Sequence, residues 1–173
     1  MREIIFRAKV KDKDELISKG FPIDENGNPI SEWVYGVPTP IPGYPDLFTA
    51  WNVFNGEYEE LTVITETIGQ YTGLTDKNGK KVFEGDIIRY CERFDYQMYQ
   101  ESIEDPEAYD GELYSPAFSI GAVVYYTDVF SGFDISNHNF DSNGLSELIC
   151  SGDYFYEVIG NIHDNPELLT DSN

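Results

Sequence analysis

Short apolar stretches rich in β-branched and aromatic residues recur along the chain, and their pattern predicts strands. We expect strands at Ile4–Val10, Glu32–Tyr35, Leu61–Ile68, Asp86–Tyr90, Ile120–Tyr126 and Tyr154–Ile162. Helical periodicity is scarce. Short helices are expected at Lys13–Lys19 and Leu145–Ile149, with one C-terminal turn that Asn165 caps and Pro166 begins. This pattern predicts a mainly-β roll or small barrel with little helix.

Asn-Gly bends punctuate the strands. They occur at Asp24–Gly27, Asp76–Gly79 and Asp141–Gly144, where short side chains bond nearby backbone and glycine accepts positive φ. The second bend has strand-like flanks on both sides, Gly69–Leu74 and Lys80–Phe83. It is therefore the clearest hairpin in the chain.

Two stretches are expected to be loops. Val37–Pro45 contains four prolines, which remove ladder donors. Gln97–Ser115 contains six acidic residues and no basic one, and it lies between two predicted strands. We interpret residues 93–117 as a mobile acidic loop or insertion, in which a short helix can form. One domain spanning residues 1–173 is the simplest organisation, because 173 residues is a common single-domain size.

Charge is the strongest compositional signal. The formal net charge is −21, and residues 94–173 hold sixteen Asp and Glu but no Lys or Arg. Such a field repels nucleic acid unless a local basic patch overrides it. One basic cluster lies near aromatic residues: Lys77, Lys80 and Lys81 at the hairpin and Arg89 and Arg93 farther on, with Tyr71, Phe83 and Tyr90. This cluster leaves open a stacking surface for single strands as a minor hypothesis.

Targeting and redox signals are weak. The charged opening MREIIFRAKVKDKDE does not resemble a signal peptide, and no stretch has the length of apolar sequence that spans a membrane. We therefore expect a cytoplasmic protein. Cys91 and Cys150 are expected to be free, partly buried thiols, since neither lies in a CxxC pair.

Three separated stretches carry a family resemblance. The chain opens with MREIIFR, continues at 68–88 with IGQYTGLTDKNGKKVFEGDII, and ends at 156–169 with YEVIGNIHDNPELL. In this order the stretches resemble the YopX family of small phage and prophage proteins. The resemblance implies an SH3-type small barrel and expression in the cytoplasm of a bacterial host. It implies no activity, cofactor or catalytic residue. The acidic stretch between Arg93 and Phe118 is longer than the corresponding segment of the family pattern.

No group of residues has the types and spacing typical of a catalytic, metal or phosphate site. The candidate soft metal ligands are Cys91, His138, Cys150 and His163, and they lack paired spacing. The three bends lack the complete set of oxygen ligands, including the final Glu, that a calcium-binding loop requires. No phosphate-cradling glycine motif occurs, and the abundance of carboxylates makes any one pair uninformative. We predict no catalytic, cofactor-binding or metal-binding residue, and no enzymatic activity.

The function predicted from these observations is a non-enzymatic phage or prophage accessory protein. It would act by binding an unknown protein partner of the host or phage, or by assembly into a homo-oligomer. The alternative is an acidic decoy that occupies the DNA-binding site of a host protein. A third possibility, a carboxylate-based hydrolase, requires a concave pocket on which acids converge.

Overall fold

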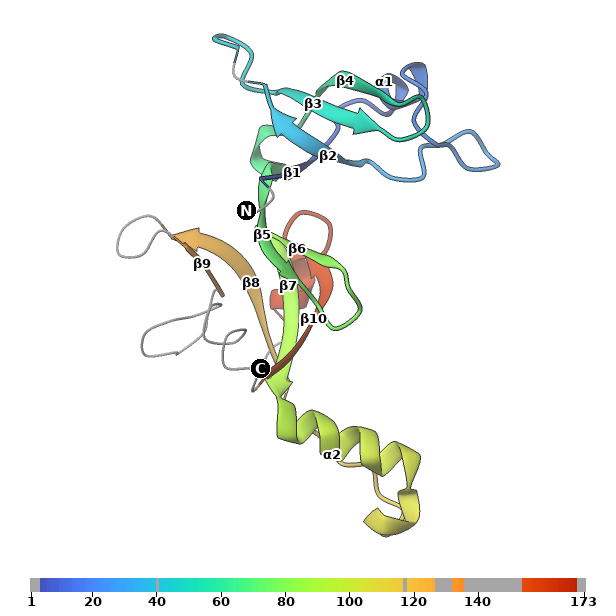
Figure 1. The fold of residues 1–173 in the computed structure, drawn as a ribbon, viewed down its shortest axis with the longest axis vertical. Helices are drawn as coiled ribbons and strands as arrows, with labels where there is room; N and C mark the ends of the chain where they lie inside the picture. Colours follow the sequence, from blue (N-terminus) through green and yellow to red (C-terminus); the bar gives the residue numbers. More distant parts are fainter. Residues whose placement is uncertain (1–3, 40, 117, 127–131, 136–153, 171–173) are drawn as a thin grey trace. The chain divides into compact units, whose positions relative to one another are not determined.

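The computed structural model describes residues 4–39, 41–116, 118–126, 132–135 and 154–170 (Figure 1). They gather into two compact units, Met1–Gly73 (unit 1) and Leu74–Asn173 (unit 2). The boundary falls inside strand β5, Gly69–Thr75, so one strand contributes residues to both units. The expectation of a single domain over residues 1–173 stays a prediction.

Unit 1 is built on an antiparallel sheet. Along it the strand order is β4-β3-β2-β1-β5. The strands are β1 (Phe6–Lys9), β2 (Trp33–Pro38), β3 (Leu47–Asn52), β4 (Glu57–Thr62) and the start of β5. The register pairs Ala8 with Val34 and Phe48 with Leu61, so alternate residues of neighbouring strands meet on one face. That face forms the core of the unit.

Helix α1, Lys13–Ser18, contributes to this core. Asp12 caps its N-terminus by accepting a hydrogen bond from the Asp14 N–H at 2.9 Å. Leu16 is fully buried in the cluster that also contains Phe48 and Leu61. Glu15 accepts a hydrogen bond from the Thr62 N–H at 3.0 Å, which ties the helix to β4. The helix is therefore part of the packed unit although it has only six residues.

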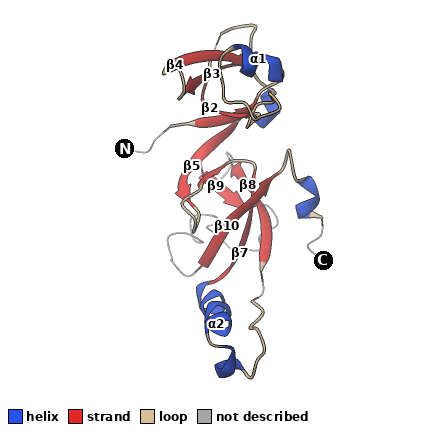
Figure 2. Ribbon diagram, turned by 90° about the vertical axis from the view of Figure 1, so that its right-hand side faces the viewer, coloured by secondary structure: helices blue, strands red, loops and turns tan. Residues whose placement is uncertain are grey.

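Unit 2 contains a second antiparallel sheet in the order β10-β7-β8-β9. The strands of unit 2 are β6 (Lys81–Phe83), β7 (Asp86–Glu92), β8 (Ser119–Tyr126), β9 (Gly132–Ile135) and β10 (Tyr154–Asn161), and the 3-10 turn η3 (Pro166–Leu169) follows β10. Val82, Ile88, Tyr90 and Val123 form its buried cluster. Strands predominate in both units, as Figure 2 shows by colour.

Helix α2, Arg93–Glu104, follows directly after β7, and the 3-10 turn η2, Pro106–Tyr109, follows α2. Residues 93–104 contain no glycine or proline, so nothing local interrupts the helix. The helix ends before Asp105 because a residue preceding proline disfavours helical φ/ψ. The expected acidic loop is therefore not confirmed, because the segment begins with three turns of α-helix.

The mainly-β prediction is confirmed, and so are several strands and the bends at Asp24 and Asp76. Among the described residues the strands form open sheets and no closed barrel, so an SH3-type barrel is not confirmed. The predicted strand at 61–68 is too long, since β4 ends at Thr62 and residues 65–67 form the 3-10 turn η1. The expected helix at 145–149 and the third bend lie outside the described residues.

The C-terminal turn exists as η3, with Pro166 in its first turn as expected. Asn165, however, makes no capping bond with its side chain. Its Oδ1 atom faces the Asn161 N–H at 3.4 Å instead. Within the described part of the chain, no helix has the length and apolarity needed to cross a bilayer.

Replacement of Leu16 by alanine tests the role of α1. Because Leu16 is fully buried in the unit 1 core, we expect Leu16→Ala to lower the free energy of unfolding by about 3 kcal/mol. The exposed neighbour Ile17 gives a matched control, and Ile17→Ala should cost less than about 1 kcal/mol. Urea denaturation monitored by circular dichroism measures both. Equal small costs would show that α1 does not contribute to the core.

Candidate functional site

The charged cluster of unit 2 is centred on Glu157 in β10. Its Oε2 atom lies 2.9 Å from Lys77 Nζ, and its Oε1 atom forms an ion pair with the guanidinium of Arg89. Arg89 and Glu157 are direct cross-strand partners in the β7–β10 register. Lys77 comes from the β5–β6 bend. One carboxylate therefore pairs with cations from two separate elements.

Aromatic rings complete this cluster. Lys77 Nζ donates a hydrogen bond to Tyr96 Oη at 2.9 Å and lies 4.6 Å from the centroid of the same ring. The rings of Tyr96 and Phe155 have centroids 4.1 Å apart. The Arg93 guanidinium lies 5.0 Å from the Phe155 ring centroid. Cation–π contacts thus attach the first turns of α2 to β10.

The ion pairs shift the pKa of both partners. Burial acts to raise the pKa of Glu157, but the hydrogen bonds from Lys77 and Arg89 outweigh it, and the pKa ends below its ordinary value. For Lys77, burial acts to lower the pKa, yet the hydrogen bonds with Tyr96 and Glu157 leave it raised. Both groups therefore stay charged at neutral pH, and the cluster is a structural clamp.

This arrangement removes the predicted stacking surface for nucleic acid. Tyr71, Phe83 and Tyr90 are buried and cannot stack on bases. Two of the five expected cations, Lys77 and Arg89, are paired with Glu157. Sequence spacing grouped these residues correctly near one hairpin. It could not show that the charges of Lys77 and Arg89 are neutralised by Glu157, which lies 68 positions beyond Arg89 in the chain.

The predicted soft ligands do not come together in the described residues. Cys91 is a free, buried thiol in β7, as expected, and burial raises its pKa. His163 is exposed in the turn after β10. His138 and Cys150 lie outside the described residues. Over the ranges that the structure describes, no three His, Cys, Asp or Glu side chains are placed to hold a metal ion.

The segment 93–116, which we call the acidic arm, contains α2 and η2 and carries seven acidic residues after its single basic residue, Arg93. Tyr114 donates to Asp95 at 2.9 Å and Tyr109 donates to Glu101 at 3.0 Å. These hydrogen bonds raise the pKa of both tyrosines, with burial first among the causes at Tyr109. The carboxylates of Asp95 and Glu101 are thus hydrogen-bonded by neutral donors.

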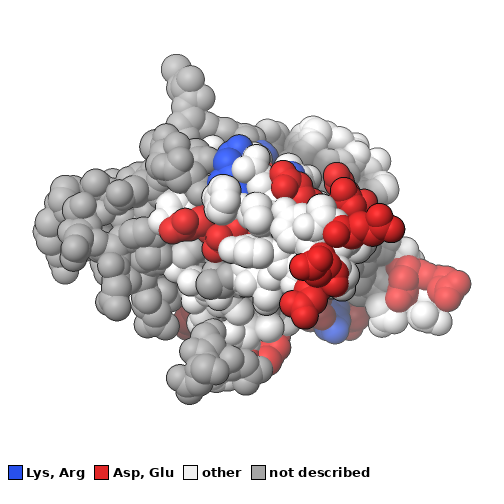
Figure 3. Space-filling model, turned by 90° about the horizontal axis from the view of Figure 1, so that it is seen from below, with Lys and Arg blue, Asp and Glu red and all other residues white. Residues whose placement is uncertain are grey.

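The surface reflects this imbalance. Figure 3 shows acidic side chains outnumbering basic ones over the face seen from below. They lie in several separate groups with uncharged residues between them.

The buried Ser102 connects two parts of the acidic arm. Its Oγ atom donates to the Tyr99 carbonyl and accepts from the Tyr114 N–H.

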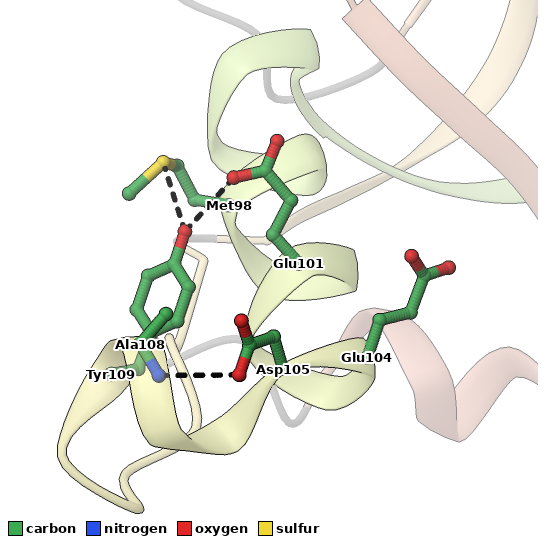
Figure 4. Close-up of a pocket in the computed structure, with 6 residues that line it drawn as sticks. All are labelled: Met98, Glu101, Glu104, Asp105, Ala108 and Tyr109. Carbon is green, nitrogen blue, oxygen red and sulfur yellow. Dashed lines mark hydrogen bonds between the residues drawn. The ribbon is translucent and has the colours of Figure 1, made fainter.

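An open hollow of about 530 Å³ lies between α2 and η2 and is lined by Met98, Glu101, Glu104, Asp105, Ala108 and Tyr109 (Figure 4). Its acids do not converge. Glu101 accepts from the Tyr109 hydroxyl and Asp105 faces the Ala108 N–H at 3.4 Å, whereas Glu104 points away from both. The carboxylate-based hydrolase requires acids aimed at one point, so this hollow does not favour it.

The bend at Asp76–Gly79 joins the sheet through a buried carboxylate. Asp76 Oδ1 accepts hydrogen bonds from the N–H groups of Asn78 and Lys80 at 2.8 and 2.9 Å. Its Oδ2 atom accepts from the Val158 N–H at 3.1 Å, across 82 positions of sequence. The Tyr156 hydroxyl donates to the Thr75 carbonyl at 2.6 Å. The DKNG stretch therefore closes its own turn and holds the edge of β10.

Two glycines allow close contacts between segments of unit 2. Gly85 has φ of 81° and links two segments, donating to the Val123 carbonyl and accepting from the Ile162 N–H. At Gly160, beside a β-bulge, an added Cβ would lie 2.7 Å from Asn165 Oδ1 and 2.9 Å from Leu168 Cδ1. Glycine at position 160 thus lets η3 pack closely against β10.

Asp76→Asn should destabilise the protein because the amide presents an N–H₂ group to the Val158 N–H or to the turn, whichever way it is oriented. We expect a loss of about 2 kcal/mol in the free energy of unfolding. Asp24 is a matched control, since its Oδ1 atom accepts from Asn26 and Asn28 in the same pattern while the turn is exposed. Asp24→Asn should cost less than about 1 kcal/mol. Chemical denaturation compares them, and equal losses would contradict a long-range role for Asp76.

Glu157 should make stability depend on pH. Its pKa in the folded protein is lowered, so the ionised form contributes stability above the unfolded pKa, and this contribution is lost as pH falls through the folded value. We expect wild type to lose more stability than Glu157→Gln between about pH 5 and pH 3. Thermal melts across this range measure the difference. The exposed Glu25→Gln variant should retain the wild-type dependence, and identical profiles for all three proteins would refute the prediction.

Comparison with known proteins agrees with the resemblance seen in the sequence. The family model described as YopX protein matches residues 45–170, which include the 68–88 and 156–169 stretches but not the opening MREIIFR. Among solved structures, the chain is similar to the crystal structure of protein EF1440 from Enterococcus faecalis, with 23% identity, a TM-score of 0.40, and coverage of 98% of this chain and 99% of that chain. None of the curated proteins matches. Since the family model covers well over half of the sequence, the chain belongs to the YopX family.

Proposed function

We propose that this YopX-family protein is a non-enzymatic accessory protein of a phage or prophage, active in the cytoplasm of the bacterial host, and that it binds a basic partner protein through the acidic arm. The family membership supports the phage context. Residues shared with the family pattern, such as Asp76, Gly85 and Gly160, have structural roles in turns and strand contacts. This supports a scaffold rather than a catalyst.

The observation that carries the proposal is the uncompensated charge of the arm. Residues 94–116 hold seven acidic side chains and no basic one, and those with hydrogen bonds receive them from neutral tyrosine or backbone groups. Arg93, which begins the arm, lies over the Phe155 ring, and Lys77 and Arg89 are paired with Glu157. Such a surface attracts a positively charged partner and raises its association rate.

The acidic decoy is the second candidate. It is favoured by the same acidic arm, whose charged residues after Arg93 are all negative. As a decoy, this arm would occupy the DNA-binding site of a host protein. A close mimic of DNA would present carboxylates in regular rows, and the acidic groups in Figure 3 are instead separated by uncharged residues. We therefore rank the decoy below general partner binding. Self-assembly remains the other mode of interaction, and the expected carboxylate repulsion opposes contact between two arms.

Affinity capture from phage-infected bacteria tests the proposal. The arm variant combines Glu104→Gln, Glu107→Gln and Glu112→Gln, three exposed positions whose side chains make no hydrogen bond in the described structure. Its control combines Asp14→Asn, Glu25→Gln and Glu66→Gln, exposed positions in unit 1 with the same change in net charge. We expect wild type and the control to retain a partner at low salt, and the arm variant to lose most of it.

Salt and competition separate the candidates. Binding through the arm should weaken as salt is raised above physiological ionic strength, where screening acts within about 8 Å. Release of the captured partner by duplex DNA would favour the decoy. Equal capture by the arm variant and the control would refute a role for the arm. Light scattering that shows a stable oligomer with no other protein bound would favour self-assembly.

A further inference from the structure

The outer face of the unit 1 sheet carries exposed aromatic side chains. Trp51 in β3 and Tyr58 in β4 are direct cross-strand partners on the face opposite Phe48 and Leu61. Trp51 is 45% exposed and Tyr58 is 72% exposed. The ring centroids lie 4.8 Å apart and the planes are tilted by 59°, so neither ring covers the other. Both rings therefore keep accessible faces at the free edge that β4 forms.

A carboxylate borders this ring pair. Glu60, two positions after Tyr58 in β4, is exposed and has no ion pair with any residue that the structure describes. Glu60 lies on the same face as Tyr58, because alternate residues of a strand share a face. The ring pair thus combines π-faces with negative charge, which is the chemistry that holds an ammonium or guanidinium group.

The cations of unit 1 that the structure describes are already engaged. Lys9 and Lys13 pair with Glu32, Lys11 with Asp46, and Lys19 with Glu59. Arg7 lies 4.8 Å from the centroid of the Trp33 ring, so this sheet already uses one cation–π contact. No described cation lies over Trp51 or Tyr58. Residues 94–173 contain no Lys or Arg, so that part of the chain cannot fill the site either.

Charge complementarity therefore identifies the occupant. We propose that Trp51, Tyr58 and Glu60 form a docking site for an arginine or lysine side chain in a basic segment of another protein. A second copy of this chain is a poor occupant, since each copy carries −21 and its unit 1 cations would have to leave existing ion pairs. A nucleic acid is opposed by the same charge. The inference rests on the proposed partner-binding function and adds a surface on unit 1 that is separate from the acidic arm.

The test uses a short synthetic peptide containing four arginines separated by glycine and serine, with a citrulline peptide of the same length as control. Citrulline keeps the planar side chain but has no charge. Calorimetry gives the Kd, and fluorescence in a Trp33→Phe background reports on Trp51, since the chain has two tryptophans. We expect the arginine peptide to bind and quench Trp51, and Tyr58→Ala or Glu60→Gln to weaken binding about tenfold.

Tyr44→Ala, another exposed tyrosine of unit 1, should bind like wild type, and thermal melts should show that all variants are folded. Unchanged affinity in Tyr58→Ala would overturn the inference, as would equal binding of the citrulline peptide. A dimer that Tyr58→Ala converts to a monomer would assign the face to a second copy and also overturn it. The arm variant separates the two proposals: loss of peptide binding there, with Tyr58→Ala unaffected, refutes this site and leaves the proposed function standing.

Discussion

The second unit depends on how the bend after β5 is fastened to the last strand. Asp76 is buried, and its two oxygens accept hydrogen bonds from three backbone N–H groups, two in its own turn and one in β10. A buried carboxylate is stable only when it is well supplied with donors. The same residue therefore closes a local turn and ties together segments that are 82 positions apart. Glu157, one position before Val158, adds its ion pairs to Lys77 and Arg89 at the same place.

Basic side chains in this protein mainly make contacts within the chain. With few exceptions, the described Lys and Arg residues either pair with a carboxylate or lie over an aromatic ring. The carboxylates of the acidic arm, in contrast, form no ion pair with any Lys or Arg that the structure describes. This division explains how a chain with such a large excess of acid forms two compact units: the few cations lie where the strands and helices meet. Surface electrostatics and core stability are thus linked through the same residues.

Much of the strand pattern could be predicted from the sequence because it follows from local composition. The hairpin around Asp76 and the strands near Asp86, Ile120 and Tyr154 were all visible as apolar or β-branched stretches with turn residues beside them. Strand β3 was missed because Leu47–Asn52 follows a proline-rich segment and contains Asn, Thr and Ala. Helix α2 was missed because it buries only Ser102 and so lacks an apolar face. Its signal was the absence of Gly and Pro before Pro106.

The candidate sites were less predictable, because they depend on long-range pairs. No local pattern indicates that Glu157 would neutralise Lys77 and Arg89, or that Tyr90 and Phe83 would be core residues. The Trp51–Tyr58 pair likewise arises from the β3–β4 register. The metal ligands considered from the sequence were rejected on spacing, and the described residues contain no cluster that could hold a metal.

The limits of the family match and of the folding unit differ in this chain. The match begins at residue 45, just before β3, whereas β1, β2 and α1 precede it and supply Ala8, Val34 and Leu16 to the core shared with Phe48 and Leu61. A fragment cut at the family boundary would keep the β3–β4 hairpin but lose the side chains that shield its apolar face from water. Homology boundaries are therefore a poor guide for shortening this protein, because residues that complete the unit 1 core lie before the family match.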